Sequence, residues 1–311
     1  MTATDPQSTH RADGKCSFDS IYDQPDPSAY YTTLKPLRYQ IPHHAQPIFR
    51  RAARAVSRLR GGRTPIEMLD LCCGYGVNGA LLNHEASMDD LYRHYRRAPV
   101  EAGTLPRRLE QDCAHFHKRR VGQPYARVTG IDVAGHALDY GKAVGLLDSA
   151  LHINLEEGLP SEAACARLAR ADLITVTGGL SYIGAATFAR LMGLFPRHRL
   201  PWVIAFPLRH TDFSPCAEVL EEAGLAVECW TRWAYPHRAY GDAEERERIV
   251  GAIESDGGDA VGKPANRSHI EAVMYVARPV MDMERCDLSE LVGADQRSGA
   301  APRPWEEARP G

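Results

Sequence analysis

The stretch that most constrains the fold is residues 66–82, with the sequence I-E-M-L-D-L-C-C-G-Y-G-V-N-G-A-L-L. Its first six residues are typical of a buried strand, Gly74 and Gly76 indicate a tight turn, and residues 77–82 begin a helix. A strand, a glycine turn and a helix in this order present backbone N–H groups and a helix N-terminus at the carboxyl end of a strand. Open α/β sheets bind nucleotide-like ligands there, so the stretch predicts such a site.

The chain after this stretch alternates between strands and helices. Parallel strands need crossover connections, so the alternation predicts a mostly parallel sheet. Further strands are expected at residues 127–132, 150–153, 171–177 and 202–206, and a closing antiparallel pair at 225–230 and 270–277.

Four divisions of the chain follow from its composition. Proline density in residues 18–49 argues against one long helix there and favours short helical turns and extended pieces, followed by a basic helix at 49–59. Residues 84–122 form a helical insertion that we expect to be structural or interfacial. The divisions are a disordered N-terminus (1–17), an aromatic and proline-rich N-terminal lid (18–63), a ligand-binding domain (64–280) and a disordered tail (281–311).

Composition narrows the classes of partner. The formal net charge of −3 gives no general attraction to nucleic acid or membrane, and no apolar run approaches the ~20 residues that span a bilayer. The eight cysteines include no C-x-x-C pair, and the first ten residues lack a signal-peptide layout. We therefore expect a cytoplasmic protein with reduced thiols, no metal and no nucleic-acid or membrane partner, and leave a homodimer open. Cys113, His115 and His117 spread around a helix and predict no metal site.

Residues 69–76, L-D-L-C-C-G-Y-G, resemble motif I (L-D-L-G-x-G-x-G) of the class I S-adenosylmethionine methyltransferases. Cys72 stands where the motif has its first glycine. Because cysteine carries a Cβ, we expect that this position does not need a positive φ. The resemblance covers residues 64–278. It implies a doubly wound, Rossmann-like methyltransferase sheet of seven strands, mostly parallel with an antiparallel last strand, preceded by a helical or extended lid.

The resemblance also implies S-adenosyl-L-methionine as the cofactor. Asp132 would take the ribose hydroxyls, as an acid at the end of the second strand does in doubly wound folds. Asp70 would orient the glycine loop or the methionyl ammonium, the alternative being a helix-capping aspartate. Asn154 would meet the adenine edge, the alternative being a turn asparagine. The full set of expected cofactor-binding residues is Asp70, Cys72, Gly74, Gly76, Asp132, Asn154 and Thr177.

The loop at 177–182 is expected to border the sulfonium and the methyl acceptor. It lacks the D-P-P-Y or N-P-P-Y signature of nucleic-acid and glutamine N-methyltransferases, which disfavours an enzyme that modifies bases. Tyr182 would offer an aromatic face or a hydroxyl group, or else pack under the following helix. His210 is the predicted base, because the pKa of histidine lies near working pH. The other candidates are Asp212, His237, His43 and His44.

Four tyrosines in the lid form the last candidate group. They would build an aromatic wall that excludes water and stabilises the sulfonium, or else belong to a packed extension over the sheet edge. They are Tyr22, Tyr30, Tyr31 and Tyr39.

Three functions remain open. The first is methyl transfer from S-adenosylmethionine to a small molecule, with in-line displacement of S-adenosylhomocysteine. The second is a cyclisation of the azetidine-2-carboxylate synthase type, in which the amine of S-adenosylmethionine attacks its own Cγ and methylthioadenosine leaves. The third is an inactive interaction protein that binds S-adenosylmethionine.

Overall fold

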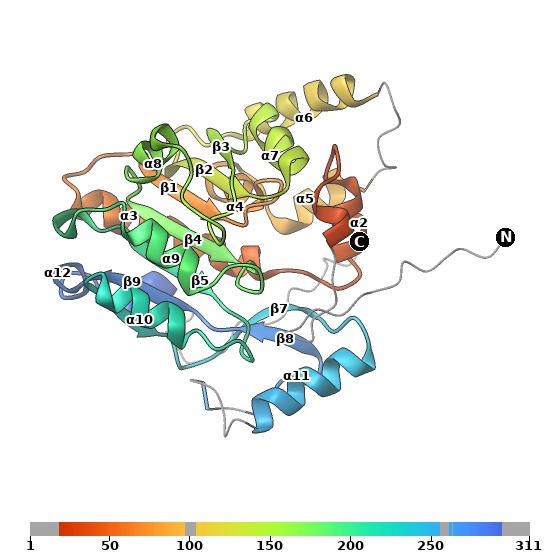
Figure 1. The fold of residues 1–311 in the computed structure, drawn as a ribbon. Helices are drawn as coiled ribbons and strands as arrows, with labels where there is room; N and C mark the ends of the chain where they lie inside the picture. The colour runs from red at the N-terminus through yellow and green to blue at the C-terminus, as the bar shows by residue number, and fades with distance from the viewer. Residues whose placement is uncertain (1–18, 97–103, 256–260, 263, 294–311) are drawn as a thin grey trace.

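The main sheet has seven strands and forms the frame of the molecule (Figure 1). The computed structural model describes residues 19–96, 104–255, 261–262 and 264–293. Across the sheet the strands follow the order β3-β2-β1-β4-β5-β9-β6. In chain order they are β1 (Ile66–Leu71), β2 (Ala126–Asp132), β3 (Ser149–His152), β4 (Leu173–Thr177), β5 (Trp202–Phe206), β6 (Leu225–Cys229) and β9 (Tyr275–Pro279).

β1 lies in the middle of the parallel part of the sheet. Its Asp70 stands opposite Gly130 of β2 and opposite Thr175 of β4, two partners that are far apart in the sequence. β9 is the last strand in the chain and runs antiparallel to both β5 and β6. This order and these directions confirm the predicted doubly wound, Rossmann-like sheet, mostly parallel with an antiparallel last strand, in which the carboxyl ends of β1, β2 and β4 meet at one edge.

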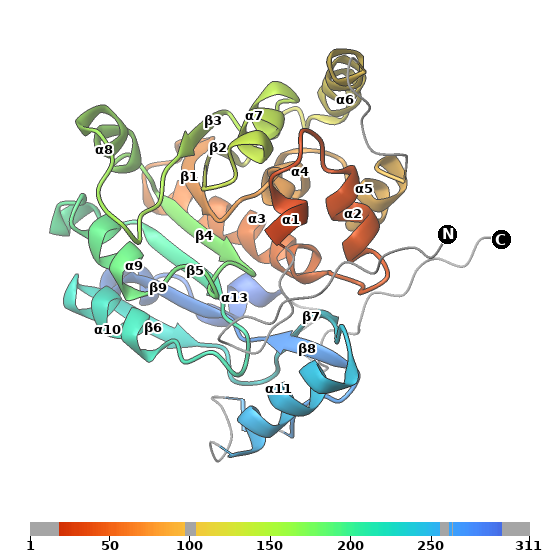
Figure 2. The same cartoon turned by 45° about the vertical axis from the view of Figure 1, so that its right-hand side comes forward.

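Helices cover both faces of the sheet, as Figure 2 shows. The side chains of β5 alternate between two hydrophobic cores: Trp202 and Ile204 belong to the first, and Val203 and Ala205 to the second. The first core includes α3 (Ile41–Leu59), α4 (Val77–Asn83) and α7 (Gly135–Ala143), whereas the second includes α8 (Glu162–Leu168), α9 (Ala185–Met192) and α10 (Ser214–Glu222). A short 3-10 helix, η1 (Arg197–Arg199), precedes β5.

The N-terminal segment, residues 19–59, is more helical than its prolines predict. The short helices α1 (Asp19–Tyr22) and α2 (Ser28–Leu34) agree with the predicted short helical turns. α3, however, runs unbroken for 19 residues from Ile41, so it begins earlier than the helix predicted at 49–59. Pro42 sits in the first helical turn, where no intrahelical N–H bond is required. Pro47 lies inside the helix and removes one N–H donor, but the buried face of α3 packs against α4, β4 and β7 and outweighs this cost.

The insertion is helical, as predicted, and contains two helices. They are α5 (Met88–His94) and α6 (Leu105–Arg119). Met88, Leu91, Tyr92 and Tyr95, spaced i, i+3, i+4 and i+7, form an apolar stripe that is buried to within 2% relative exposure. Residues 97–103, between the two helices, lie outside the described part of the chain.

The C-terminal part differs from expectation in two ways. Residues 270–277, predicted as one strand, contribute to two: β8 (His269–Ala272) pairs with β7 (Tyr235–Ala239) in a separate two-stranded sheet, and β9 joins the main sheet. Strand β7 was not predicted, because its sequence Y-P-H-R-A contains a proline and two basic residues. Helix α11 (Ala243–Ser255) lies between β7 and β8.

The tail begins with ordered structure. Residues 281–293 were expected to be disordered, but α12 (Val280–Met283) and α13 (Leu288–Val292) are helical. α13 packs on α3, and the Arg51 guanidinium donates a hydrogen bond to the carbonyl of Leu291 (2.9 Å). The predicted disorder at residues 1–17 and 294–311 falls outside the described residues. Within the described ranges, no helix combines the length and apolar character needed to cross a membrane.

Candidate functional site

A cavity of about 390 Å³ lies at the carboxyl ends of β1, β2 and β4. Its floor contains residues of the glycine turn after β1, the end of β2 and the loop after β4. Its roof comes from the N-terminal segment. The cavity gathers most of the residues that the sequence singles out: Tyr22, Tyr30, Tyr39, Cys72, Gly74, Asp132, Asn154, Thr177 and Tyr182.

The glycine turn has left-handed backbone at three positions. φ is +49° at Gly74 and +81° at Gly76, which forms the N-cap of α4. It is +52° at Cys72, so the expectation that this position does not need a positive φ was wrong. The left-handed region costs a residue with a Cβ about 1–2 kcal/mol, so the surrounding structure must impose it on Cys72.

The loop after β4 packs closely against Cys72. A Cβ placed on Gly179 would lie 2.6 Å from Cβ and 2.8 Å from Sγ of Cys72. The Cys72 thiol donates a weak hydrogen bond to the carbonyl oxygen of Gly179, with Sγ 3.8 Å away. Burial raises the pKa of the thiol, so it stays neutral. The side chain of Cys72 thus occupies the space that the missing side chain of Gly179 leaves open.

Asp132 lies where β2 ends and links two parts of the floor. Its Oδ2 accepts the N–H of Gly74 (2.7 Å) and its Oδ1 accepts the N–H of Ala134 (2.9 Å). Burial raises the pKa of this carboxyl, and the backbone donors oppose that shift by favouring the charged form. Two carboxylate oxygens offer about four acceptor positions, so this group can take further hydroxyl donors from the cavity.

Asp70 lies beneath the floor instead of lining the cavity. It is fully buried, and its Oδ1 accepts hydrogen bonds from Asn78 (Nδ2, 2.9 Å) and Thr175 (Oγ1, 2.9 Å). Its Oδ2 has no hydrogen-bond partner among the described residues. Burial raises the pKa of Asp70 to about 7. Asn78 also donates to Oγ1 of Thr177 (3.0 Å), so one amide joins the ends of β1 and β4.

Asn154 lines the cavity and also shapes its own turn. Its Oδ1 accepts the N–H of Glu156 (3.0 Å), and its Nδ2 donates to Oε1 of Glu157 (2.9 Å). Both sequence-based readings of Asn154, the turn and the ligand wall, are therefore compatible with its position. Leu155 beside it is buried and lines the same wall.

Three of the four predicted tyrosines form the roof. Tyr22, Tyr30 and Tyr39 line the cavity, with Tyr30 edge-on to both of the others at centroid distances of 5.5 and 6.3 Å. Tyr31 does not line it. Its ring stacks on Tyr95 of the insertion at 4.5 Å with an interplanar angle of 4°. Tyr31 therefore forms an outer layer that ties the roof to the insertion.

Contacts from three directions hold the roof in place. The hydroxyl of Tyr75, in the glycine turn, accepts the N–H of Gln24 (2.9 Å). The hydroxyl of Tyr92 on α5 donates to the carbonyl of Tyr39 (2.7 Å), and Arg108 on α6 forms an ion pair with buried Asp26 (2.6 Å). The insertion thus has the structural role expected of it, as a support for the roof.

The two predicted catalytic residues lie in different surroundings. Tyr182 lines the cavity and is 40% exposed, so it does not pack under the following helix. His210 is not among the lining residues, and the role of base finds no support in its position. His237, another of the base candidates, lies beside the cavity. Its ring is edge-on to that of Tyr39 at 5.1 Å.

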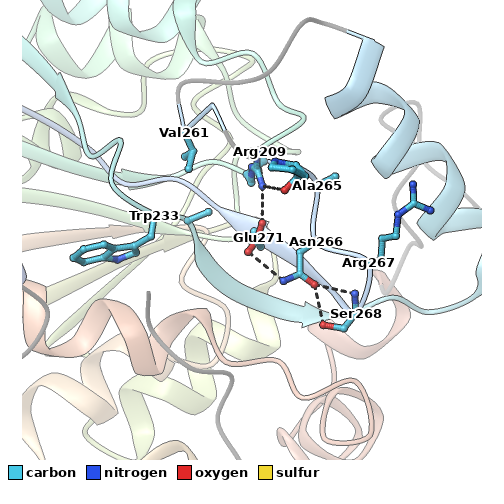
Figure 3. Close-up of a pocket in the computed structure, with 10 residues that line it drawn as sticks. Arg209, Trp233, Val261, Ala265, Asn266, Arg267, Ser268 and Glu271 are labelled. Carbon is cyan, nitrogen blue, oxygen red and sulfur yellow. Dashed lines mark hydrogen bonds and ion pairs between the residues drawn. The ribbon is translucent and has the colours of Figure 1, made fainter. Parts of the chain in front are cut away.

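A second, larger cavity of about 600 Å³ lies by the β7–β8 sheet (Figure 3). Its polar groups bind one another: Arg209 pairs with Oε2 of Glu271 at 2.7 Å, and Asn266 accepts the Ser268 hydroxyl at 2.8 Å. Its polar side chains are therefore engaged with one another. The described residues hold no cluster of three or more His, Cys, Asp or Glu that is arranged to bind a metal ion.

Sequence reasoning missed two residues that build the floor, Tyr75 and Asn78. Tyr75 stands between the two glycines of the turn, and its buried hydroxyl reaches the N-terminal segment. Asn78 comes two residues after Gly76 and faces the strand ends. Its position in the first turn of the helix after a glycine loop is a signal that could have identified it.

Comparisons with known proteins give structural neighbours only. No protein-family model matches the chain, and no curated protein matches its sequence. A TehB-like SAM-dependent methyltransferase from Corynebacterium glutamicum is 15% identical with a TM-score of 0.36, covering 74% of this chain and 87% of that one. Magnesium protoporphyrin IX methyltransferase from Synechocystis, solved with bound SAH, is 10% identical with a TM-score of 0.37, covering 78% and 85%. The plantazolicin methyltransferase BamL is 12% identical with a TM-score of 0.36, covering 76% and 85%. The fold assignment therefore rests on the strand order and directions of the sheet itself.

Proposed function

We propose that the protein is an S-adenosylmethionine-dependent methyltransferase that acts on a small molecule. The observation that carries the proposal is the position of Asp132. Its carboxylate stands at the end of β2, hydrogen-bonded to the left-handed glycine turn and open to a cavity of about 390 Å³. In doubly wound folds, an acid in this position binds ribose hydroxyls beside a glycine loop.

The residues present fit the parts of S-adenosylmethionine. Asp132 would accept the ribose hydroxyls, and Asn154 with Leu155 would border the adenine. Cys72 and Gly74 line the path toward the methionyl part, with the acceptor-rich carboxyl of Asp70 beneath them. When bound, this ligand supplies a methyl carbon on a cationic sulfur, which an acceptor attacks in line as S-adenosylhomocysteine leaves and the acceptor loses a proton.

The protein's contribution to this reaction would be positioning and exclusion of water. Tyr22, Tyr30 and Tyr39 line the cavity, and an aromatic face turned toward the sulfonium would stabilise this cation. Gly178 and Gly179 let the β4 loop pack closely against the rest of the site, because a Cβ on Gly178 would meet Tyr39 and one on Gly179 would meet Cys72. Tyr182 stands at the exposed side of the cavity, where an acceptor would enter.

A second candidate is intramolecular cyclisation of S-adenosylmethionine with release of methylthioadenosine. The size of the cavity favours it. About 390 Å³ lies near the lower end of the roughly 300–1,000 Å³ range of small-molecule sites, which suits one ligand better than two. In that reaction, the enclosed tyrosine roof would serve to keep the amine of the ligand neutral and water out.

One experiment separates these functions. The purified protein is incubated with S-adenosylmethionine, alone and with a panel of small acceptors, and the products are identified by mass spectrometry. S-adenosylhomocysteine that forms only with an acceptor supports methyl transfer. Methylthioadenosine formed without an acceptor supports the cyclisation and contradicts methyl transfer. Binding without either product supports the third reading, an inactive protein that binds S-adenosylmethionine.

A further inference from the structure

The contact between the roof and the β7–β8 sheet contains a histidine that the proposed reaction does not yet use. His237 lies on β7 and is 1% exposed. The register of β7 against β8 shifts between Pro236 and Arg238, so His237 is the extra residue of an irregularity in the strand. Bulges of this kind re-aim a side chain and are frequent beside active sites.

The irregularity directs the imidazole to the end of the cavity. A Cβ on Gly178 would lie 3.2 Å from Nε2 of His237 and 3.1 Å from the hydroxyl oxygen of Tyr39. Both groups therefore converge on Gly178, whose φ is +72°. The absence of a side chain at this position allows the phenol and the imidazole to meet over the β4 loop.

The backbone joins the same two residues. The N–H of Gln40 donates to the carbonyl of His237 (2.8 Å), and the N–H of Ala239 donates to the carbonyl of Leu37 (2.6 Å). The segment around Tyr39 thus lies along β7 as an added strand-like piece. A change at His237 reaches Tyr39 both through the rings and through this pairing.

We propose that Tyr39 contacts the reacting end of the bound ligand beside Gly178, and that His237 is the positioning residue that holds the Tyr39 phenol there. The inference rests on the proposed function, because it takes S-adenosylmethionine as the ligand. Tyr39 lines the cavity and His237 lies behind it, so His237 acts through Tyr39. Burial raises the pKa of the Tyr39 hydroxyl, which remains a neutral dipole at working pH.

A double-mutant cycle tests the proposal. The variants are Tyr39→Phe, His237→Ala, His237→Gln and the double variant Tyr39→Phe/His237→Ala, with exposed His198→Gln on η1 as the matched control. Calorimetry gives the Kd values for S-adenosylmethionine and S-adenosylhomocysteine, and mass spectrometry gives the rate of product formation. Thermal unfolding of each variant confirms that it is folded.

Positioning predicts a specific pattern. Tyr39→Phe and His237→Ala should each lower the preference for S-adenosylmethionine over S-adenosylhomocysteine by roughly five- to tenfold. The rate of product formation should fall further, by up to about a hundredfold, because misplacement of the reacting groups by about an ångström can have such an effect. His237→Gln should recover part of both losses, since its amide can still meet the phenol. In the Tyr39→Phe background, His237→Ala should add little.

Three results would overturn the inference. The first is an unchanged ligand preference and an unchanged rate in His237→Ala. The second is additive effects in the double variant. The third is equally weakened binding of both ligands in His237→Ala and His237→Gln, which indicates a purely structural role. If His237→Ala does not fold, the comparison of Tyr39→Phe with His237→Gln decides. A wild-type protein that binds S-adenosylmethionine without product release contradicts the proposed function instead, and the binding cycle then tests the inference alone.

Discussion

The floor of the cavity is shaped by backbone conformation, whereas its roof is shaped by side-chain packing. On the floor, three left-handed residues and the carboxylate of Asp132 set the positions of polar groups. In the roof, Tyr22 and Tyr30 lie edge-on to each other, and Tyr31 stacks on Tyr95 of the insertion. The difference teaches that changes in the floor should alter ligand binding through single polar contacts. Changes in the outer layer of the roof should instead alter the stability of the fold.

The largest expected effect comes from the outer layer of the roof. Tyr31→Ala removes a buried ring that stacks on Tyr95, and should lower the free energy of unfolding by about 3–5 kcal/mol in urea titrations. The Kd for S-adenosylmethionine should change little at temperatures where the variant stays folded. The matched variant is Tyr22→Ala, which removes a half-buried lining residue and should weaken binding more than folding. If Tyr31→Ala mainly weakened binding and Tyr22→Ala mainly lowered stability, the division between the outer layer and the lining would be wrong.

The second effect concerns pH and the buried carboxyl beneath the floor. Because the pKa of Asp70 is raised in the folded state to about 7, the protonated form is favoured by folding. Its contribution to stability is complete below about pH 4 and is lost as the pH rises toward 7. Between pH 5 and pH 7 the loss should be about 2–3 kcal/mol, at about 1.4 kcal/mol per pH unit.

Asp70→Asn tests this assignment. The amide keeps an oxygen to accept the Asn78 and Thr175 hydrogen bonds but does not titrate. Urea unfolding at pH 5, 6, 7 and 8 should therefore show a flatter dependence in the variant than in the wild-type protein. Parallel curves would show that Asp70 is ionised throughout this range.

The third effect separates binding from folding on the floor. Asp132→Ala should weaken S-adenosylmethionine binding by about 1–3 kcal/mol on calorimetry, because the ribose hydroxyls would lose their acceptor. Asp132→Asn is the control, since it keeps one oxygen for the N–H of Gly74. An unchanged affinity in Asp132→Ala would refute the ribose assignment.

The smallest effect isolates the strained turn. At φ +52°, glycine should be more stable than alanine by about 1 kcal/mol, so Cys72→Gly should unfold at a higher temperature than Cys72→Ala. Both variants remove the thiol, and their comparison isolates the backbone. Equal unfolding temperatures would mean that the turn relaxes to an ordinary φ when the thiol is absent.

The sequence was most informative where local patterns decide the structure. The β1 stretch and Asp132 follow from an apolar run, glycine spacing and an acid at a strand end, which neighbouring residues encode. The sequence alone did not show which of Tyr30 and Tyr31 lines the cavity. Consecutive helical residues point about 100° apart, so the two cannot both face the cavity, but only the packing of α5 decides which does. Likewise, the side chain of Cys72 packs against Gly179, more than 100 residues away, and no local pattern reveals this contact.

The complementarity of Cys72 and Gly179 has a consequence for how such a sequence can change over generations. A side chain at position 179 would collide with Cys72, since its Cβ would lie 2.6 Å from that of the cysteine. Glycine at position 72 removes the obstacle and leaves a hollow that alanine at position 179 fills. Gly179→Ala should thus be harmful alone and tolerated together with Cys72→Gly. The order in which the two substitutions arise is then constrained, because a lineage can combine glycine at position 72 with alanine at position 179 without loss only if position 72 changes first.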